Sequence, residues 1–433
     1  MVVVNTKPCV LFVTPILGYP PKGGPELRID NSIKALAKIA KITLYCRIFP
    51  ASIGGKTALK YLMNFVDSIH FSPFCRQRPS FIQFLIRGTN FLSRFCFKRN
   101  FFVFTFETEA DFHDVVLTAN SIDADVIWLG FGNISYPLLK YIKQHSNIPV
   151  VVDTDSVWSR FVLRGSPFAK NIAERTRIES EGKAKEEEER WGTRLADVTT
   201  AVSTVDLMYY RSIANNPSRI HIFSNVIDLD FYKFVSGCTW IKTPSIYLAG
   251  SFGKNSPMED SVHWMLKFVL PILKRELPEI HFYIIGRGSI ETLSNVKDTS
   301  VTVVGELPSV LPYLTNTTVA IVPLRYESGT RFKILEAGAC GIPVVSTTLG
   351  AEGLPITHGK NILIADSPED FANAIMSVIR DRRLAERLGL NLKELVCESY
   401  SIDSLVYEGQ NILEYLLKEK YNLSQVTNRM IEV

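Results

Sequence analysis

The sequence predicts an α/β protein built from two doubly wound, Rossmann-like domains in tandem. Short apolar runs alternate with amphipathic stretches along most of the 433 residues, which is the β-α-β pattern of parallel sheets covered by helices. The pattern begins again near Ser245, after the irregular stretch Asp228–Pro244. With 46% hydrophobic and 21% charged residues, the chain has the composition of a packed globular protein.

The predicted strands are short apolar runs, rich in β-branched residues and bounded by turn residues. In the first half they are Val10–Thr14, Ile42–Arg47, Val126–Leu129, Val150–Asp153, Thr199–Val202 and Ile220–Phe223. In the second half they are Ile246–Ala249, Phe282–Ile285, Val301–Val304, Ala320–Pro323, Val344–Thr347 and Ile362–Ile364. The helices expected between them include Leu27–Ile39, Pro137–Gln144, Ser261–Glu276, Arg331–Cys340 and Pro368–Arg380. Because parallel sheets bind ligands at the carboxyl ends of their strands, the two domains should share a cleft.

The changes of pattern also predict the domain boundaries. We expect a first domain over residues 1–227, a linker over 228–244 and a second domain over 245–398. A helical tail over 399–433 should pack back on the first domain. The charged segment Glu174–Arg194 is predicted to be a long helix in solvent.

The composition excludes several classes of protein. A net charge of +4 is too small to indicate a nucleic-acid partner. The seven cysteines are odd in number and form no C-x-x-C pair, which favours reduced thiols in a cytoplasmic protein over a disulfide framework or a zinc site. The chain shows no signal peptide, and no run approaches the ~20 apolar residues that span a bilayer. Membrane contact would therefore be peripheral.

The most informative segment is Val319–Leu354, which has the pattern of a strand, a glycine-bearing loop, a helix and a second strand. Gly329 would let the backbone approach a ligand closely, and Ser328 and Thr330 are candidate caps for the helix. The helix N-terminus would then offer free N–H groups and a positive dipole end to a diphosphate.

Three side chains of this helix could extend that site. Arg331 and Lys333 would add positive charge, with Arg331 able to grip a phosphate in a bidentate way. The Glu336 carboxylate could accept hydrogen bonds from a ribose diol. Spacing alone explains Lys333 and Glu336 equally well as surface residues of an ordinary helix.

A second glycine loop follows the first predicted strand, in the segment Pro15–Arg28. Gly23 and Gly24 permit close backbone approach to a phosphate, and the helix behind them supplies a dipole. A rigid turn with no ligand is the alternative for this proline-rich loop.

The second-domain segment resembles the signature of family four of the retaining nucleotide-sugar glycosyltransferases, which have the GT-B fold. The resemblance rests on Gly329 to Arg331, Lys333, Glu336-Ala337, Gly341, Pro343 to Thr347 and Gly350 to Leu354. It covers the second domain, and more loosely the first domain through Gly23, Gly24, Arg28 and Asn225 to Asp228. It implies a donor-binding second domain and an acceptor-side first domain.

The resemblance implies roles for the matched positions only. Glu336 matches the second glutamate of a paired motif, which binds the donor ribose. The position of the first glutamate holds Ser328, and the adjacent Glu327 is our candidate for contact with the transferred sugar. The family's basic pair has a counterpart in Lys254 alone, so we expect Arg331 and Lys333 to supply part of the charge on the diphosphate.

The acceptor side of the cleft is predicted from the strand end Val150–Asp153 and the residues after it. Asp153 and Asp155 alternate there, so one of them should point into the cleft; we take Asp153 as the catalytic candidate, and Asp155 could instead cap a helix. Many relatives carry a histidine after the preceding strand, whereas this chain has Asn133. That residue could bind a sugar hydroxyl or form a turn.

The resemblance implies transfer with retention of anomeric configuration, in which the leaving phosphate of the donor accepts the acceptor's proton. We expect no metal and no cofactor, because the GT-B fold uses helix dipoles and basic side chains in place of a cation. The acceptor would be a glycan or a lipid-linked sugar. The alternatives are a nucleotide-sugar 2-epimerase and a catalytically degenerate protein that binds the donor.

One further segment could contact a membrane. Residues 81–99 carry Arg87, Arg94 and Lys98 beside several phenylalanines, as in helices that lie on anionic bilayers. The segment would then hold the protein at the inner face of the membrane. A core-facing helix with a basic edge is the alternative.

Overall fold

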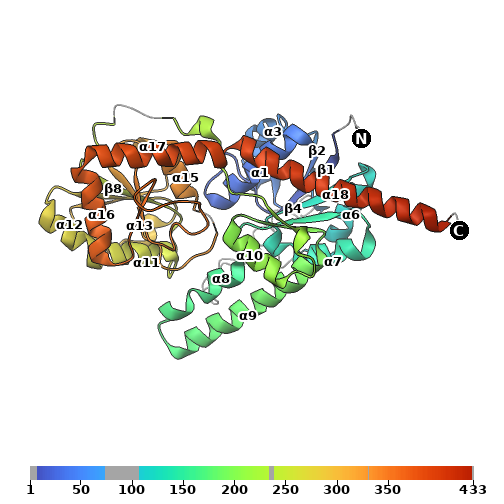
Figure 1. Cartoon of the computed structure of the whole chain (residues 1–433), viewed down its shortest axis with the longest axis horizontal. Helices are drawn as coiled ribbons and strands as arrows, with labels where there is room; N and C mark the ends of the chain where they lie inside the picture. The colour runs from blue at the N-terminus through green and yellow to red at the C-terminus, as the bar shows by residue number, and fades with distance from the viewer. Residues whose placement is uncertain (1–6, 74–106, 234–237, 330, 432–433) are drawn as a thin grey trace.

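The computed structural model describes residues 7–73, 107–233, 238–329 and 331–431, of which 419–431 are described as backbone only. The chain folds into two α/β domains lying side by side (Figure 1). Each domain has its own parallel sheet, covered by helices on both faces. The predicted fold class is confirmed.

The sheet of the first domain has seven parallel strands in the order β3-β2-β1-β4-β5-β6-β7. The strands are β1 (Cys9–Thr14), β2 (Lys41–Cys46), β3 (Ser68–Phe71), β4 (Val126–Gly130), β5 (Val150–Asp153), β6 (Val198–Ala201) and β7 (Ile220–Ile222). The central strands are continuous apolar runs because both of their faces are buried under helices.

The sheet of the second domain has six parallel strands in the order β10-β9-β8-β11-β12-β13. The strands are β8 (Ser245–Ala249), β9 (His281–Ile285), β10 (Val301–Gly305), β11 (Val319–Val322), β12 (Val344–Ser346) and β13 (Leu363–Ile364). In both sheets the strand order reverses beside the first strand of the domain. Such a switch point is where doubly wound sheets open a crevice for ligands.

The helices that follow the strands include those that form the cleft, such as the helix after β1 and the helix after β11. In the first domain they are α1 (Gly24–Ile39), α7 (Tyr136–His145), α8 (Trp158–Leu163), α9 (Ile172–Leu195) and α10 (Thr204–Ile213). In the second domain they are α11 (Pro257–Trp264), α12 (Leu270–Glu276), α15 (Phe332–Ala339), α16 (Pro368–Arg380) and α17 (Arg382–Ser399). Further α-helices of the described part are α2 (Pro50–Ile53), α3 (Gly55–Leu62), α6 (Glu109–Ser121), α13 (Ser289–Thr292) and α14 (Leu311–Leu314).

The chain crosses between the domains twice, and the two crossings touch. The first follows β7, and the second joins α17 to the last helix, α18 (Ile402–Ile431). The Ile227 N–H donates to the Tyr400 carbonyl over 3.0 Å. In Figure 1, α17 lies along the second domain and α18 continues over the first.

Helix α18 is part of the core of the first domain. Its apolar face contributes Leu405, Ile412, Leu413 and Leu416, which are 0–3% exposed and share a hydrophobic cluster with α1. The Glu408 carboxylate accepts from the Ser224 N–H and hydroxyl over 2.6 and 2.8 Å. The second crossing therefore fastens the end of the chain to the first domain.

All twelve strands predicted from the sequence are present within one or two residues of the expected bounds. The structure adds β3, a short and only half-buried edge strand. Helix α9 is the expected charged helix, but one acid of its run, Glu189, is buried. Glu189 accepts from the Ser159 N–H, the Ser159 hydroxyl and the Tyr209 hydroxyl over 3.0, 2.5 and 2.7 Å.

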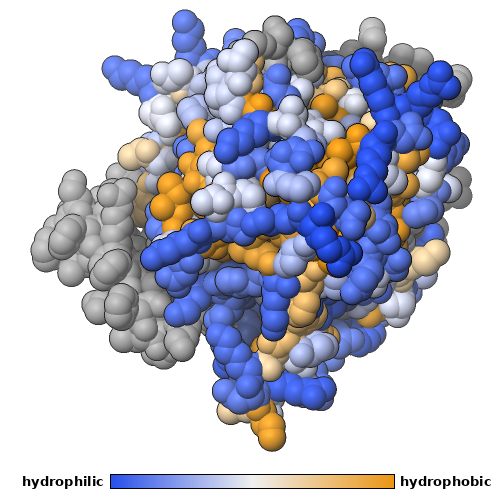
Figure 2. All heavy atoms as spheres, turned by 90° about the vertical axis from the view of Figure 1, so that its left-hand side faces the viewer, coloured by the Kyte–Doolittle hydropathy of each residue, from blue (hydrophilic) through white to orange (hydrophobic). Residues whose placement is uncertain are grey.

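Seen from the end of the second domain, the surface is largely hydrophilic, with apolar groups scattered across it (Figure 2). Exposed apolar side chains of this domain, such as Trp240, Phe268 and Leu390, lie on different elements. Scattered groups of this kind are ordinary for a soluble surface.

Candidate functional site

A cleft of about 2590 Å³ lies between the two domains, and both domains line it. From the first domain come the loop before α1, the residues after β5 and one face of α9. From the second domain come the residues after β8 and the loop and helix after β11. The cleft is where the carboxyl ends of the central strands of both sheets face each other.

The two glycine loops predicted from the sequence meet across this cleft. Gly23 has a φ of 82° and precedes α1, which starts with no side-chain cap. A Cβ on Gly24 would lie 3.1 Å from the Phe332 ring, at the start of α15. The N-termini of α1 and α15 therefore converge on one region of the cleft.

The start of α15 differs from the prediction. The helix begins at Phe332 and Arg331 occupies the N-cap position with no side-chain cap, so Ser328 is not a cap. Thr330 lies outside the described residues. Ser328 and Gly329 belong to the preceding loop and line the cleft.

Lys333 and Glu336 project from α15 into the cleft, as predicted. Within the described part of the chain, no carboxylate lies within ion-pair distance of the Lys333 ammonium, whose one hydrogen-bond contact is the Met258 sulfur at 3.6 Å. Burial lowers the pKa of Lys333. The Glu336 carboxylate accepts from the Tyr232 hydroxyl over 2.9 Å, and burial raises the pKa of Glu336.

Arg331 is turned into the loop that it follows. It is only 4% exposed, and its Nη1 donates to the carbonyls of Ser328, over 2.7 Å, and of Gly329. Its Nε lies 3.6 Å from the Glu327 carboxylate, and among the described residues Nε and Nη2 have no hydrogen-bond partner. A grip on phosphate through Nη1 is therefore excluded in this conformation, while the Nε–Nη2 edge makes no hydrogen bond to the described residues and has the Glu327 carboxylate beside it.

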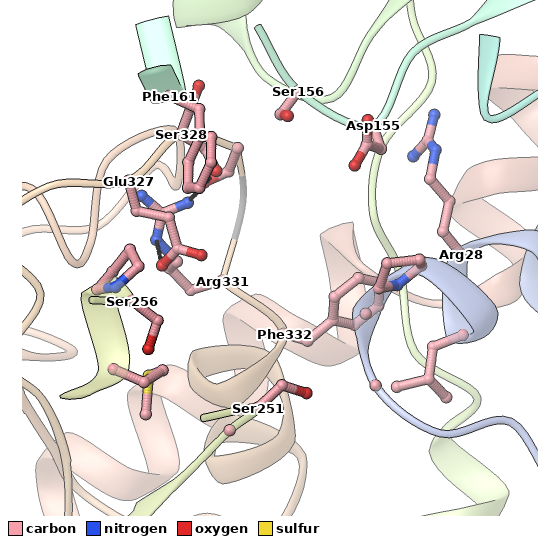
Figure 3. A pocket seen from close by; sticks show the side chains of 18 of the residues that line it. Arg28, Asp155, Ser156, Phe161, Ser251, Ser256, Glu327, Ser328, Arg331 and Phe332 are labelled. Atoms are coloured by element: carbon pink, nitrogen blue, oxygen red, sulfur yellow. Dashed lines mark hydrogen bonds and ion pairs between the residues drawn. The ribbon is translucent and has the colours of Figure 1, made fainter. Parts of the chain in front are cut away.

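Figure 3 shows the cleft from close by. Glu327, Ser328 and Arg331 lie together on the second-domain side, with Asp155 and Ser156 across from them. A Cβ on Gly329 would lie 2.9 Å from the Ser156 Cβ, so the loop of the second domain touches the first domain directly.

Lys254 lies on another wall of the cleft, between β8 and α11. Its side chain is exposed, and within the described ranges it forms no ion pair. Ser251, in the same loop, would lie 3.8 Å from a Cβ on Gly23. Lys254 is thus on the second-domain side of the gap between the two glycine loops.

The expectation that Asp153 points into the cleft is not met. Asp153 is fully buried and accepts from Arg28, from the Trp128 indole over 3.2 Å and from the Thr200 hydroxyl over 2.8 Å. Arg28 also donates to Asn225 over 2.8 Å. Asp153 is therefore part of a network that fixes the strand ends and the helix behind the first glycine loop.

Asp155, two residues later, is the aspartate that lines the cleft. It does not cap α8, whose N-cap is Val157; its Oδ1 accepts from the Trp158 indole over 2.9 Å. Burial raises the pKa of Asp155 to about 6. Its protonation state therefore changes in the range where a group can accept or donate a proton near neutral pH.

Asn133 holds this segment in place. It is 2% exposed, its amide donates to the Ser156 carbonyl over 2.9 Å, and its Oδ1 accepts from the Asp155 N–H over 3.1 Å. Both ends of the amide are thereby used within the protein. Asn133 positions Asp155, and the turn alternative describes it better than contact with a sugar.

Sequence reasoning missed the residues that α8 and α9 bring to the cleft. Trp158 and Phe161 line it from α8, and Glu181 and Lys185 line it from α9. Glu181 and Lys185 are four residues apart and therefore share one face of α9, which could have indicated a face toward the cleft. The many charged residues of this segment instead led to the prediction that the whole helix lies in solvent. The chain's seven histidines are all described, and none lines the cleft.

Two other expectations concern metals and membranes. Among the described residues, no group of three or more His, Cys, Asp or Glu side chains could hold a metal ion. In the same part of the chain, no helix has the length and the apolar character that crossing a bilayer requires. Residues 81–99 lie outside the described residues.

Comparison with known families gives a match in the second domain. Residues 243–381 match the family model described as glycosyl transferases group 1. The predicted enzyme class, glycosyltransferase, is confirmed by this match. The comparison with curated protein sequences gives no match.

Solved structures of similar fold cover both domains. Sucrose-phosphate synthase from Thermosynechococcus elongatus has a TM-score of 0.67 and 16% identity, over 95% of this chain and 100% of that one. HepE from Anabaena in complex with UDP and glucose has a TM-score of 0.62 and 15% identity, over 95% of this chain and 99% of that one. The lipopolysaccharide outer core galactosyltransferase WaaB, without ligand, has a TM-score of 0.55 and 14% identity, over 94% of this chain and 99% of that one. At these identities the likeness establishes the two-domain fold.

Proposed function

We propose that the chain transfers a sugar from a nucleotide-sugar donor, held in the cleft between the domains, to a glycan or lipid-linked acceptor. The observation that carries the proposal is the pair Lys333 and Glu336. One is an ammonium without a carboxylate partner and the other is a half-buried carboxylate, three residues apart on the helix that begins at the cleft. A nucleoside diphosphate offers the complementary groups, phosphate oxygens and a ribose diol.

The diphosphate would lie where α1 and α15 converge. Both helices start there without a side-chain cap, so their N-terminal N–H groups and dipoles favour an anion. Lys333 and Lys254 would add two positive charges. Four sources of positive potential then stabilise the leaving diphosphate, and we propose that the reaction needs no metal and no cofactor.

The ribose would bind at Glu336. The Tyr232 hydroxyl orients one carboxylate oxygen, and the other is left to accept from a diol. Charge-assisted hydrogen bonds of this kind contribute ~1.5–3 kcal/mol each. Glu336 is therefore the residue whose loss should weaken donor binding most.

The transferred sugar would lie between the donor loop and the first domain. Glu327 and the Nε–Nη2 edge of Arg331, which makes no hydrogen bond in the described part of the chain, face it from the second domain, and Asp155 faces it from the first. We propose transfer with retention: the leaving phosphate accepts the proton of the acceptor hydroxyl as the new bond to the sugar forms. Asp155 would orient the acceptor hydroxyl by accepting its hydrogen bond.

UDP-glucose is the first donor to test, because HepE has been solved with it. Titration calorimetry should show that UDP-glucose binds the wild-type protein, and Glu336→Gln should weaken binding by about 10-fold or more. A transfer assay with glycan acceptors should then give a product whose anomeric configuration, measured by NMR, is that of the donor.

Four results would count against this account. Unchanged affinity of Glu336→Gln for UDP-glucose and other nucleotide sugars would exclude the ribose site. Loss of activity in excess chelator would contradict the metal-free reaction. Epimerised donor without transfer would favour the 2-epimerase alternative, and binding without turnover would favour a degenerate protein.

We also propose that the protein works in the cytoplasm, at the inner face of the membrane, with residues 81–99 as its contact. Co-sedimentation with anionic liposomes should be lost in Arg87→Glu/Arg94→Glu/Lys98→Glu. No sedimentation of the wild-type protein would contradict it.

A further inference from the structure

The donor loop of the second domain, residues 325–331, is held from the first domain as well as from its own. The segment that holds it is the arm, residues 158–195, which comprises α8, α9 and the turn between them. The arm projects from the first domain in Figure 1, and the residues of its turn contact the second domain.

Arg164, at the end of α8, makes the central contact. Its Nη1 donates to the Glu327 carbonyl over 2.7 Å and to the Glu352 carboxylate over 2.6 Å, and its Nη2 donates to the same carboxylate over 2.8 Å. Both side chains are only 25–28% exposed, so water competes weakly for these bonds. Desolvation by burial raises the pKa of Glu352, but the hydrogen bond from Arg164 and the positive charges of nearby arginines together lower it by more. The pKa of Glu352 is therefore below its ordinary value, which keeps the carboxylate charged.

Other contacts of the arm lie beside this one. The Phe168 ring packs on the Tyr326 ring, with centroids 4.6 Å apart, and the Arg325 guanidinium lies over Phe168. The Lys170 ammonium donates to the Asn255 side chain over 2.8 Å. The arm therefore contacts the loop at Arg325, Tyr326 and Glu327 in succession.

The loop carbonyls are divided between two guanidinium groups of opposite domains. Arg164 holds the carbonyl of Glu327, and Arg331 holds those of Ser328 and Gly329. Arg331 belongs to the loop and keeps its contacts when the domains separate. Arg164 does not, so the Glu327 backbone depends on the first domain for its partner.

Building on the proposed function, we propose that Arg164 is a positioning residue: through it the arm fixes the donor loop at Glu327. The loop then takes its sugar-binding conformation only when the arm is docked on it. Residues of the arm that line the cleft, such as Phe161 and Lys185, are thereby connected to the donor loop by the Arg164 side chain.

The test combines kinetics with hydrogen–deuterium exchange in the full-length protein, using UDP-glucose as the probe. Arg164→Ala should raise the exchange of amides in residues 325–331, raise the donor KM by about 10-fold and lower kcat, since a loose loop binds and orients the sugar less well. Arg164→Lys, which keeps the charge but cannot make three directed bonds, should fall between wild type and Arg164→Ala. It also carries the test if the alanine variant does not fold.

Two controls make the outcome specific. Arg175→Ala removes an arginine–glutamate pair of the same arm that makes no contact with the second domain, and it should match wild type. Glu352→Gln removes the ion pair but leaves the bond to the Glu327 carbonyl, and it should have a smaller effect than Arg164→Ala.

The proposal is overturned if the Arg164 variants show wild-type exchange in the loop and a wild-type donor KM. It is also overturned if Glu352→Gln equals Arg164→Ala, because the ion pair between domains would then be the whole effect. Failure of the wild-type protein to bind any nucleotide sugar would instead refute the proposed function, and that result is separate from loop exchange.

Discussion

At the scale of single residues, the cleft holds charged groups whose partners are missing or few. The Lys333 ammonium has no carboxylate partner in the described structure. Glu327 Oε2 and Arg331 Nε lie 3.6 Å apart as a loose ion pair, and these atoms and Arg331 Nη2 are buried without hydrogen bonds there. Buried polar groups are normally satisfied, and each exception costs free energy. Groups of both signs left in this state are best explained by a ligand that carries both phosphates and hydroxyls.

The first prediction concerns Lys333. Replacing it with methionine removes the positive charge but keeps the length of the side chain, so donor affinity should fall by roughly 10-fold or more, as for one lost charge-assisted hydrogen bond. Calorimetry with UDP measures it. Lys360→Met, in the loop before β13, is the control and should bind UDP like wild type.

The second prediction concerns Asp155 and pH. Its folded pKa of about 6 lies above the ordinary value of 3.8, so the folded protein holds this proton over a range in which the unfolded chain has lost it. Stability from this group is present below about pH 4 and is lost as pH rises to about 6. Asp155→Asn should therefore raise the free energy of unfolding at pH 7, by on the order of 1–3 kcal/mol, and lower activity.

Denaturant unfolding at pH 7 and pH 4 measures this difference. The gain in Asp155→Asn should be much smaller at pH 4, where the folded state is protonated and the unfolded carboxyl is about half protonated. An equal gain at both pH values would mean that burial of the charge is not its source. Asp230→Asn, whose side chain is 92% exposed, should show no pH-dependent difference.

At this scale the sequence indicated which residues belong to the site better than it indicated the directions in which their side chains point. Lys333, Glu336, Gly23 and Gly24 were found because they occupy motif positions on elements with clear periodicity. Asp153 was chosen over Asp155 wrongly, because the turn of the chain after β5 decides which of the two faces the cleft. Arg331 was expected to grip a phosphate in a bidentate way; the loop carbonyls occupy its Nη1, which leaves only the Nε–Nη2 edge for such a contact.

At the scale of elements, the donor site depends on loops of one domain fitting against the other. Gly329 has a φ of 85°, and a Cβ there would lie 2.9 Å from the Ser156 Cβ and 3.1 Å from the Asp155 carbonyl. No side chain can be added without moving the loop from the first domain. The strands and helices are easier to predict than this fit, because it joins residues more than 170 positions apart.

The third prediction uses that contact. Gly329→Ala should raise the donor KM by about 10-fold through displacement of the loop, besides the ~1 kcal/mol cost of the backbone conformation. Gly359→Ala is the matched control: its φ is 74°, and nothing lies within 4 Å of its added Cβ. Steady-state kinetics with varied UDP-glucose distinguish the two, and equal KM values would contradict the role of the contact.

The fourth prediction concerns the attachment of the arm. Glu189 receives three hydrogen bonds from Ser159 and Tyr209 in a buried setting, so Glu189→Ala should leave these donors without a partner and cost about 1–3 kcal/mol of stability. Glu187→Ala, with a side chain 72% exposed, should change it by no more than ~0.5 kcal/mol. Thermal unfolding measures both, and similar melting temperatures would show that Glu189 does not anchor the arm.

At the scale of the whole molecule, α1 connects the cleft to the place where the chain crosses between domains. It begins at the first glycine loop, and Arg28, Asn31 and Lys34 contact Asn225, Val226 and Asp228 from one face. Movement of the chain at the crossings would therefore displace α1 and the glycine loop that precedes it. The sequence indicated a linker near Asp228 but not that α1 holds it.

The fifth prediction concerns α18. Ile412→Ala should destabilise the first domain by about 2–5 kcal/mol, because the side chain is fully buried in the core shared with α1. Leu390→Ala, at 65% exposure on α17, is the control and should be near neutral. Proteolysis should cut the first domain of Ile412→Ala sooner; cleavage at the wild-type rate would show that α18 adds little to that core.

The central claim is that the cleft binds a nucleotide sugar at α15. A crystal structure of the wild-type protein with UDP-glucose tests it most directly. We expect the ribose hydroxyls at the Glu336 carboxylate and the diphosphate at the Lys333 ammonium, between the N-termini of α1 and α15. Nucleotide bound elsewhere, or in the cleft without contact to either residue, would contradict the claim.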